Sequence, residues 1–459
     1  MNYSFRRVLV VFTAVCAAAP HAARAQDVQY WNATYGTRAL LLGGVVIGSS
    51  QDISAVYYNP AGLALLEKTE VILSGSGYQY SSLSIDNGAG VGGTLTSSSI
   101  DALSGMFAGE IPLSFLKTRL GYSVLTRQRF DGRIQARGLP LDTVLNVPDL
   151  QFSSADLHGE ESLNETWVGL TMARLLNPHV SFGFTTFAAV RSDRALFSTT
   201  AQAIDSSGAA AVGIQARDFS YDHWSLLWKL GLEVQFPAWS LGMTVTTPNV
   251  RVFGSGSAGR DFTVVDQGIA ASPITRVATD FQEDVASAYH TPLSVGVGGS
   301  YKFGPTRVHA SAEWFGSEAA FHVLATEPFT AQSSGQTMTN EVIQEFAAVL
   351  NYGVGIEHHF GPKLAAYGSF RTDKAPVPDS SAANSTFSRW DLSHVTAGAA
   401  FSWLHADLVL GTDFAFGSRE PRAASTPPTL EPSLPPTAKI SYKSATLFLA
   451  VKVAFGTNR

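Results

Sequence analysis

Residues 441–455 read SYKSATLFLAVKVAF, and this stretch decides the fold. Every second residue from Ala445 to Phe455 is apolar, and small or polar residues stand between most of them. A period of two places the two sets on opposite faces of a β-strand. The same alternation recurs at 293–303 (LSVGVGGSYKF), 307–314 and 405–416. The chain is therefore predicted to be all-β, with strands whose two faces differ.

The contrast between the two faces indicates what surrounds the strands. A soluble sandwich exposes a charged face to water. In this chain the polar face is mostly Gly, Ser and Thr, whereas the apolar face carries Leu, Val and Phe, with Trp and Tyr often towards the strand ends. A lipid-facing band with aromatic girdles around a crowded interior has this composition. The pattern predicts a transmembrane antiparallel β-barrel.

The connections between the predicted strands alternate between long and short, which is the rhythm of an outer-membrane barrel with short periplasmic turns and long external loops. About 14 strands follow. They are expected near 69–80, 105–115, 119–130, 163–174, 178–191, 223–236, 239–253, 291–303, 306–316, 350–360, 363–373, 389–403, 405–417 and 441–455. The long loops are expected at 81–104, 131–162, 192–222, 254–290, 317–349, 374–388 and 418–440, and a short helix is expected within 339–350.

Composition excludes several classes of protein. Only 15% of the 459 residues are charged, against roughly 25% in a typical soluble domain. After the first 25 residues no apolar run of 18 or more appears, so no transmembrane helix is expected. The net charge of −6 excludes a polycationic surface for nucleic acid. The adjacent His358 and His359 point to opposite faces of a strand and cannot chelate one metal, so no enzyme activity, metal or cofactor is predicted.

Residues 1–25 resemble a secretory signal peptide. Arg6 and Arg7 precede an apolar stretch, and Ala23-Arg24-Ala25 forms a small-x-small cleavage site. An N-terminal membrane anchor is one alternative, and lipidation at Cys16 is another, although the preceding Val15 is branched where a small residue is expected. Cleavage would remove three of the 31 basic residues and leave 28 against 37 acidic ones, a net charge of −9, with no cysteine.

Residues 26–66 do not follow the barrel pattern and are predicted to form an N-terminal hatch inside the lumen, ahead of a barrel domain at 67–459. Glycines and small residues in this segment allow close packing. The run Asn59-Pro60-Ala61-Gly62 combines an extended residue with a rigid turn. A barrel of about 14 strands is wider than its own side chains can fill, so a plug is physically reasonable.

The segments Gly36-Thr37-Arg38-Ala39-Leu40, Gly43-Gly44 and Tyr58-Asn59-Pro60-Ala61-Gly62-Leu63 resemble the hatch of the FadL/TodX family of outer-membrane hydrophobic-compound transporters. The resemblance extends over nearly the whole chain after residue 25, including Asp373-Lys374-Ala375-Pro376-Val377-Pro378. It implies a 14-stranded barrel plugged by a hatch, external loops that collect a hydrophobic ligand, and release by hatch movement or through a lateral gap in the wall. Asn59, Pro60, Ala61 and Gly62 match the hatch motif.

Apolar residues in a predicted external loop suggest a surface that captures a hydrophobic ligand; packing of the loops against one another is the alternative. The candidates are Leu139, Leu141, Val144, Leu145 and Phe152. Arg38 is a candidate contact for an anionic ligand, and an ion pair with a luminal acid such as Asp52 is the alternative.

The sequence thus predicts a multi-pass barrel in a Gram-negative outer membrane that takes up hydrophobic compounds passively, such as long-chain fatty acids or aromatic hydrocarbons. A barrel that binds a protein partner or serves secretion, and a general porin, remain alternatives. Expected partners are hydrophobic small molecules or lipids, outer-membrane lipid and the barrel assembly machinery, with the chain acting as a monomer.

Overall fold

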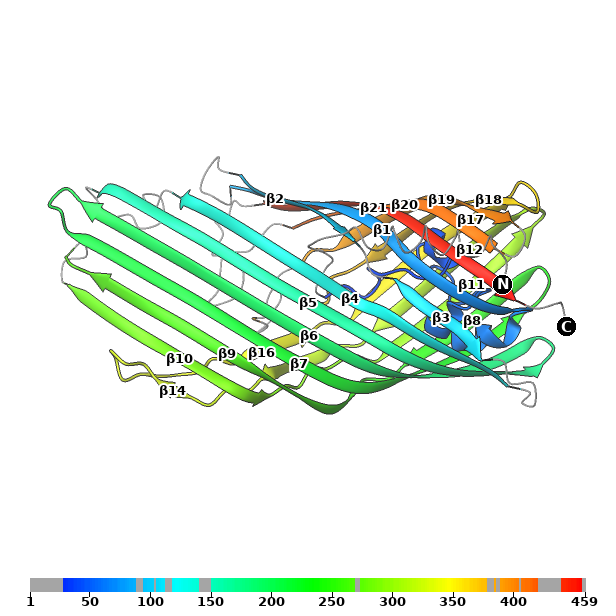
Figure 1. The fold of residues 1–459 in the computed structure, drawn as a ribbon, viewed down its shortest axis with the longest axis horizontal. Helices are drawn as coiled ribbons and strands as arrows, with labels where there is room; N and C mark the ends of the chain where they lie inside the picture. Colours follow the sequence, from blue (N-terminus) through cyan, green and yellow to red (C-terminus); the bar gives the residue numbers. More distant parts are fainter. Residues whose placement is uncertain are drawn as a thin grey trace, which may run out of the picture.

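The computed structural model describes residues 28–87, 94–102, 105–111, 118–139, 150–268, 273–377, 384, 389–403, 406–419 and 439–455. They form a closed antiparallel β-barrel of 14 strand positions (Figure 1). Three positions are each built from two successive strands, β2 with β3, β8 with β9, and β10 with β11. The barrel closes where β1 pairs with β21, from Thr69 opposite Phe455 to Asp86 opposite Lys439. The predicted 14-stranded barrel is confirmed.

The strands of the wall are β1 (Thr69–Asp86), β2 (Leu95–Ala102), β3 (Met106–Ile111), β4 (Arg119–Leu139), β5 (Leu150–Asn177), β6 (Val180–Asp205), β7 (Ala210–Gln235), β8 (Trp239–Thr246), β9 (Val250–Asp266), β10 (Ile274–Ala286), β11 (Ser294–Phe303), β12 (Thr306–Phe315), β17 (Val349–His359), β18 (Leu364–Asp373), β19 (Leu392–Trp403), β20 (Ala406–Arg419) and β21 (Lys439–Phe455). Two small antiparallel pairs lie between β12 and β17: β13 (Glu318–Leu324) with β16 (Val342–Phe346), and β14 (Phe329–Thr330) with β15 (Thr337–Met338).

Several predicted loops are strand. Most of 131–162, 192–222 and 254–290 belongs to β4–β7, β9 and β10, which extend far beyond the other strands at the end of the barrel away from the short turns (Figure 1). Part of 81–104 is β2. The prediction required a continuous apolar outer face, and the extensions mix exposed apolar residues such as Leu196 and Ile204 with charged ones such as Arg133.

The helix predicted within 339–350 is wrong. Residues 342–346 form β16, which pairs with β13, and its burial alternates along the strand. Val342, Gln344 and Phe346 face inward, whereas Ile343 and Glu345 are half-buried. Pairing with Glu318–Leu324 decides the conformation, and a single sequence does not reveal that partner.

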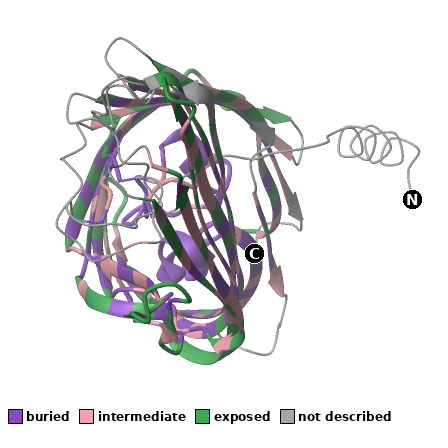
Figure 2. Ribbon diagram, turned by 90° about the vertical axis from the view of Figure 1, so that its left-hand side faces the viewer, coloured by how far each residue is buried: buried purple, intermediate pink, exposed green. Residues whose placement is uncertain are grey.

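The outer face of the barrel carries a continuous band of exposed apolar side chains. Along β20, Leu408, Leu410 and Phe414 are each about half exposed, at 46–51%, while Asp413 between them on the inner face is buried. The alternation of exposed and buried residues runs around the wall (Figure 2). Such a band is stable against lipid and would be costly in water, so the barrel has the construction of a transmembrane barrel of the outer-membrane type.

Among the described residues, no helix is long and apolar enough to cross a membrane.

Residues 28–66, here called the inner segment, lie inside the barrel near the short-turn end (Figures 1 and 2). The segment contains α2 (Arg38–Leu41), α3 (Ala55–Tyr58) and the 3-10 helix η1 (Pro60–Leu65). Most of its buried apolar residues form one cluster with inward-facing residues of the wall, including Leu125, Phe187 and Leu227. The leader predicted at 1–25 lies outside the described residues.

Candidate functional site

The Asn59-Pro60-Ala61-Gly62 motif joins the inner segment to the wall. The Asn59 side chain is fully buried. Its Nδ2 donates hydrogen bonds to the carbonyl oxygen of Ile47 at 2.8 Å and to that of Leu232 on β7 at 3.2 Å, while its Oδ1 accepts one from the backbone N–H of Ala61 at 3.2 Å. One amide therefore connects two parts of the inner segment and one wall strand.

Glycines of the wall make room for this motif. Gly183 lies opposite Gly231 in the β6–β7 ladder, and Gly242 lies opposite Gly298 in the β8–β11 ladder. A Cβ atom on Gly231 would overlap the Asn59 carboxamide, and one on Gly183 would overlap the Pro60 carbonyl. The backbone of the inner segment thus lies directly against the sheet because these positions have no side chain.

Arg38 points from α2 to the wall and is engaged in a buried ion pair. Its Nε and Nη2 lie 2.7 Å from Oε2 of Glu357 on β17, and its Nη1 donates to the carbonyl oxygen of Ser49 at 2.7 Å. The Asp52 carboxylate accepts from the backbone N–H of Arg38 at 3.4 Å. The luminal acid paired with the guanidinium is Glu357, and not Asp52 as the sequence suggested; a ligand contact at Arg38 stays a prediction.

Aromatic side chains fill the space between the inner segment and β5–β7. The rings of Tyr35 and Tyr57 meet edge to face with centroids 4.8 Å apart, and Tyr57 meets Tyr58 in the same way at 5.1 Å. Trp167 of β5 lies 6.3 Å from Tyr57. The buried ammonium group of Lys229 sits 5.0 Å from the centroid of the Tyr57 ring, a cation–π contact.

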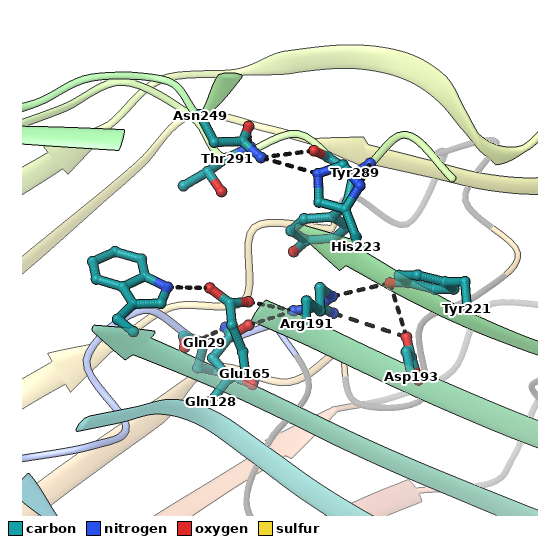
Figure 3. Close-up of polar contacts among 11 residues, drawn as sticks. Gln29, Gln128, Glu165, Arg191, Asp193, Tyr221, His223, Asn249, Tyr289 and Thr291 are labelled. Carbon is teal, nitrogen blue, oxygen red and sulfur yellow. Dashed lines mark hydrogen bonds and ion pairs between the residues drawn. The ribbon is translucent and has the colours of Figure 1, made fainter. Parts of the chain in front are cut away.

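A polar network crosses the lumen beyond these aromatics, on the side of the long strands (Figure 3). Arg191 of β6 donates through Nη1 to Glu165 and to Gln128, both at 2.8 Å, and through Nε to the Tyr221 hydroxyl at 2.9 Å. Its guanidinium also lies 3.9 Å from the centroid of the Tyr289 ring. This arginine of β6 therefore links β4, β5 and β7 to the segment that follows β10.

The same network holds the start of the inner segment. The carbonyl oxygen of Gln29 accepts from Gln128 Nε2 at 3.2 Å, and the Gln29 side chain donates to the carbonyl of Trp390 at 2.9 Å. Trp31 donates through its backbone N–H to Asp373 at 3.0 Å.

An apolar cluster, here called the upper cluster, lies farther toward the long-strand end. Its aromatic centre is Tyr289, Phe321 and Phe346, whose ring centroids are 6.0–6.3 Å apart. Strands β13 and β16 supply much of the rest. The buried members are Val28, Ala195, Phe219, Tyr221, Ala258, Tyr289, Phe321, Val323, Leu324, Val342, Phe346 and Val377.

Polar contacts join the segment between β12 and β17 to β10 and β7. Gln332 exchanges two hydrogen bonds with the backbone of Thr279 on β10, at 2.9 and 2.8 Å. Arg217 of β7 donates to the Glu341 carbonyl at 2.5 Å. Burial and the nearby Arg260 lower the pKa of Arg217 to about 10, so it still carries its charge at neutral pH.

The upper cluster was largely missed from sequence. The available signal was the apolar residues of 339–350, which were assigned to a helix, and the predicted capture residues lie elsewhere. Leu139 ends β4 and pairs with Ala155. Phe152 lies on β5, is 50% exposed and is remote from the upper cluster in the β5–β6 ladder, opposite Ile204. Leu141, Val144 and Leu145 lie outside the described residues, so a capture role for this group stays a prediction.

The wall has an incomplete ladder along one edge of β4. Strand β3 pairs with Leu120–Leu125, and the backbone N–H of Thr126 reaches the Gly105 carbonyl at 3.3 Å. Beyond this point the described part of β2 forms no continuous ladder with β4, although the Ser97 hydroxyl of β2 donates to the Arg133 carbonyl at 2.9 Å. A bulge follows Thr126, and the Tyr35 hydroxyl of the inner segment donates to the Thr126 carbonyl at 2.5 Å. We call residues 126–139 the open edge.

A cavity of about 390 Å³ lies between the inner segment and the short-turn end of the wall. Charged side chains line it on several strands, from Lys302 on β11 and Arg307 on β12 to the Asp407–Lys452 pair of β20 and β21. Its lining includes Arg38, Lys302, Arg307, Glu357, Leu364, Ala365, Tyr367, Val409 and Lys452.

No cluster of three or more metal-ligating side chains exists among the residues that the structure describes. The neighbouring histidines bond to different partners: His358 to the Thr306 hydroxyl at 2.9 Å, and His359 to Glu357 at 2.6 Å.

No family model and no curated protein matches the sequence. Solved structures do. The toluene transporter TodX of Pseudomonas putida superposes with a TM-score of 0.60 at 12% identity, over 92% of this chain and 99% of that one. A Pseudomonas aeruginosa FadL homologue gives 0.56 at 12%, over 93% and 100%, and the CymD monoaromatic hydrocarbon channel gives 0.54 at 12%, over 93% and 99%.

These structures are of one class, barrels that serve as channels and transporters, and the chain shares their fold over almost its full length. The resemblance to the FadL/TodX family predicted from the hatch motif is therefore shown at the level of the fold.

Proposed function

We propose that the protein is a passive outer-membrane channel for hydrophobic compounds. The short-turn end faces the periplasm, the long strands project outside the cell, and the inner segment acts as the hatch. Cargo enters at the upper cluster, moves toward the aromatic residues of the inner segment, and leaves when the inner segment moves.

The observation that carries this proposal is the upper cluster. A water-filled pore for polar solutes is lined by polar side chains. In this lumen, the rings of Tyr289, Phe321 and Phe346 meet above an inner segment whose own aromatics are buried. An apolar interior with a few placed polar groups is typical of sites for small hydrophobic ligands. Each buried CH2 group of such a ligand gains about 0.8 kcal/mol on leaving water.

The open edge of β4 offers a route from the lumen into the bilayer. Past Thr126, β4 has no continuous ladder to β2 in the described part of the chain, and Tyr35 of the inner segment bonds the Thr126 carbonyl. Movement of the inner segment would break the hydrogen bond between Tyr35 and Thr126 and so release β4 from the inner segment. A hydrophobic compound that leaves sideways avoids return to water. The names of the similar structures, which include toluene transporters and a monoaromatic hydrocarbon channel, support a hydrophobic cargo.

The proposal is tested by placing charge in the upper cluster. Phe321→Asp with Phe346→Asp buries two carboxylates among apolar groups, and uptake of radiolabelled toluene by cells that produce the variant should fall to the level of cells without the protein. Phe281→Asp, on the exposed outer face of β10, is the control and should transport normally. Equal uptake by the double variant and the control, at equal amounts of assembled barrel, would contradict the proposed entry site.

A further inference from the structure

Glu233 of β7 faces the inner segment with both oxygens of its carboxylate buried. Its side chain is 1% exposed, and neither oxygen has a hydrogen-bond partner among the described residues. A buried carboxylate without hydrogen bonds or a counter-charge is costly. Glu233 therefore requires a positively charged partner that the described part of the chain does not supply.

Two further oxygens close to Glu233 are in the same condition. Ser181 lies directly opposite Glu233 in the β6–β7 ladder and is fully buried. Its hydroxyl oxygen has no partner among the described residues, and neither has the buried Oε1 atom of Gln235, two positions farther along β7. Opposite residues of a ladder have Cβ atoms about 5 Å apart, so these oxygens can serve one site.

The inner segment brings a fourth acceptor to this place. Gly242 of β8 lies opposite Glu233 on its other side, and a Cβ atom on Gly242 would overlap the carbonyl oxygen of Ile47. That oxygen accepts one hydrogen bond, from Asn59, and has a second lone pair to offer. Acceptors of the wall and of the inner segment therefore meet beside the Asn59 contact.

The charged side chain that acts on Glu233 through space is Arg38. Its guanidinium is already bonded to Glu357 at 2.7 Å and to the carbonyl oxygen of Ser49 at 2.7 Å. Arg38 is therefore held by other acceptors and does not satisfy Glu233.

We propose that a sodium ion binds here, between the wall and the inner segment. Its ligands are the Glu233 carboxylate, the Ser181 hydroxyl, the Gln235 amide oxygen and the Ile47 carbonyl. Hard cations prefer such oxygen ligands, and carbonyl groups of irregular backbone coordinate sodium in membrane transporters. The ion would fasten the inner segment to β6 and β7 in addition to the amide of Asn59.

The charge and the spacing of the oxygens favour a monovalent metal ion. The site has one carboxylate, so a divalent ion would leave a net positive charge buried. A proton would satisfy one oxygen of Glu233 and leave the remaining acceptors without a partner. A metal ion bound at about 2.3–2.6 Å, the range for calcium, joins oxygens up to about 5 Å apart, which is farther than a hydrogen bond reaches.

The test compares the purified full chain in sodium chloride and in choline chloride, each at about 0.1 M. Near-ultraviolet circular dichroism follows the aromatic residues packed between the inner segment and the wall, such as Tyr57 and Trp167. The thermal midpoint of this signal should be about 2–5 °C higher in sodium chloride, because a ligand that binds only the packed state stabilises it.

Glu233→Gln keeps the shape of the side chain and removes its charge, so it should abolish the difference between the two salts. Glu70→Gln is the matched control. Glu70 is a buried glutamate of β1 whose oxygens already contact Lys452 and the backbone N–H of Ile53, so this variant should keep the sodium effect.

Ser181→Ala gives a second test that leaves the buried carboxylate in place. The sodium concentration for half of the effect should rise by about threefold to tenfold, as expected for the loss of one neutral polar contact.

Equal midpoints in sodium and choline chloride for the unaltered protein would overturn the inference, and so would stabilisation by calcium chloride alone. A sodium effect that persists in Glu233→Gln would place the ion elsewhere and would overturn it as well. The site does not rest on the proposed function. Loss of the sodium site would leave the channel proposal intact, and failure of toluene uptake would leave the sodium site intact.

Discussion

At the residue scale, Asn59 and Gly231 define how the inner segment meets the wall. The amide of Asn59 supplies the hydrogen bonds, and the missing side chain of Gly231 supplies the space. The motif could be recognised from sequence because its four residues are contiguous. Gly231 could not, since its partner is 172 positions away and a glycine in an alternating strand has many possible causes.

Gly231→Ala tests this contact. The new methyl group would overlap the Asn59 carboxamide, so the inner segment must move away from β7 while the ladder of the strand is unchanged. We expect a small polar solute to leak several-fold faster from proteoliposomes, while circular dichroism shows an unchanged β-sheet content. Gly213→Ala, farther along the same strand, meets only the Val264 side chain at 3.8 Å and serves as control. Equal leak from the two variants would contradict a space-limited contact.

At the scale of elements, contact with lipid determines which strands can be predicted from the sequence. The 14 strands were found because lipid requires an apolar outer face and the crowded lumen favours small residues, which makes the period of two visible. Beyond the bilayer the outer face meets water and mixes apolar with charged residues, although the inner face still carries apolar residues such as Phe219. The extensions of β4–β7 therefore lack the regular period of the lipid-facing strands, and the sequence predicts them as loops. The prediction for 339–350 was wrong for another reason. The conformation of β16 depends on its pairing with β13, and Val342, Ile343 and Phe346 alone also fit one face of a helix.

A reversible disulfide tests whether the β13–β16 hairpin moves during transport. Thr279→Cys with Gln332→Cys would join the hairpin region to β10, where the two residues now exchange hydrogen bonds. If cargo enters by displacing the hairpin, oxidation should lower toluene uptake at least several-fold and dithiothreitol should restore it. The sole cysteine of the chain is Cys16, in the predicted leader, so the engineered pair can be studied without other thiols.

The control for this experiment joins two strands that are not expected to separate. Ser255→Cys with Ala286→Cys bridges paired residues of β9 and β10 and leaves the hairpin free. Uptake should be the same in its oxidised and reduced forms. An oxidised Thr279–Gln332 pair that transports as fast as the reduced one would mean that cargo enters without movement of the hairpin.

At the scale of the whole molecule, two structures with different stabilising interactions are nested. The wall is held by a closed ladder of backbone hydrogen bonds; among the described strands, β2 pairs only with β1 and β10 only with β9, and the other wall strands pair on both sides over at least part of their length. The inner segment has only short helices and is held by side chains such as Arg38 and Asn59 and by packing against the wall. The wall therefore does not depend on the inner segment for its hydrogen bonds, whereas the inner segment has no structure of its own to keep without the wall.

This difference predicts the result of deleting residues 28–62. The barrel should still assemble, because the closing pair of β1 and β21 begins at Thr69. Removal of the buried aromatic and aliphatic residues should turn the lumen into a water-filled pore, so single-channel conductance in planar bilayers should rise from near zero to a steady open level. Toluene uptake should lose its dependence on Phe321 and Phe346, since an open pore no longer needs an apolar route. If the deleted protein assembles and its conductance equals that of the full chain, the inner segment does not plug the barrel and the hatch assignment is wrong.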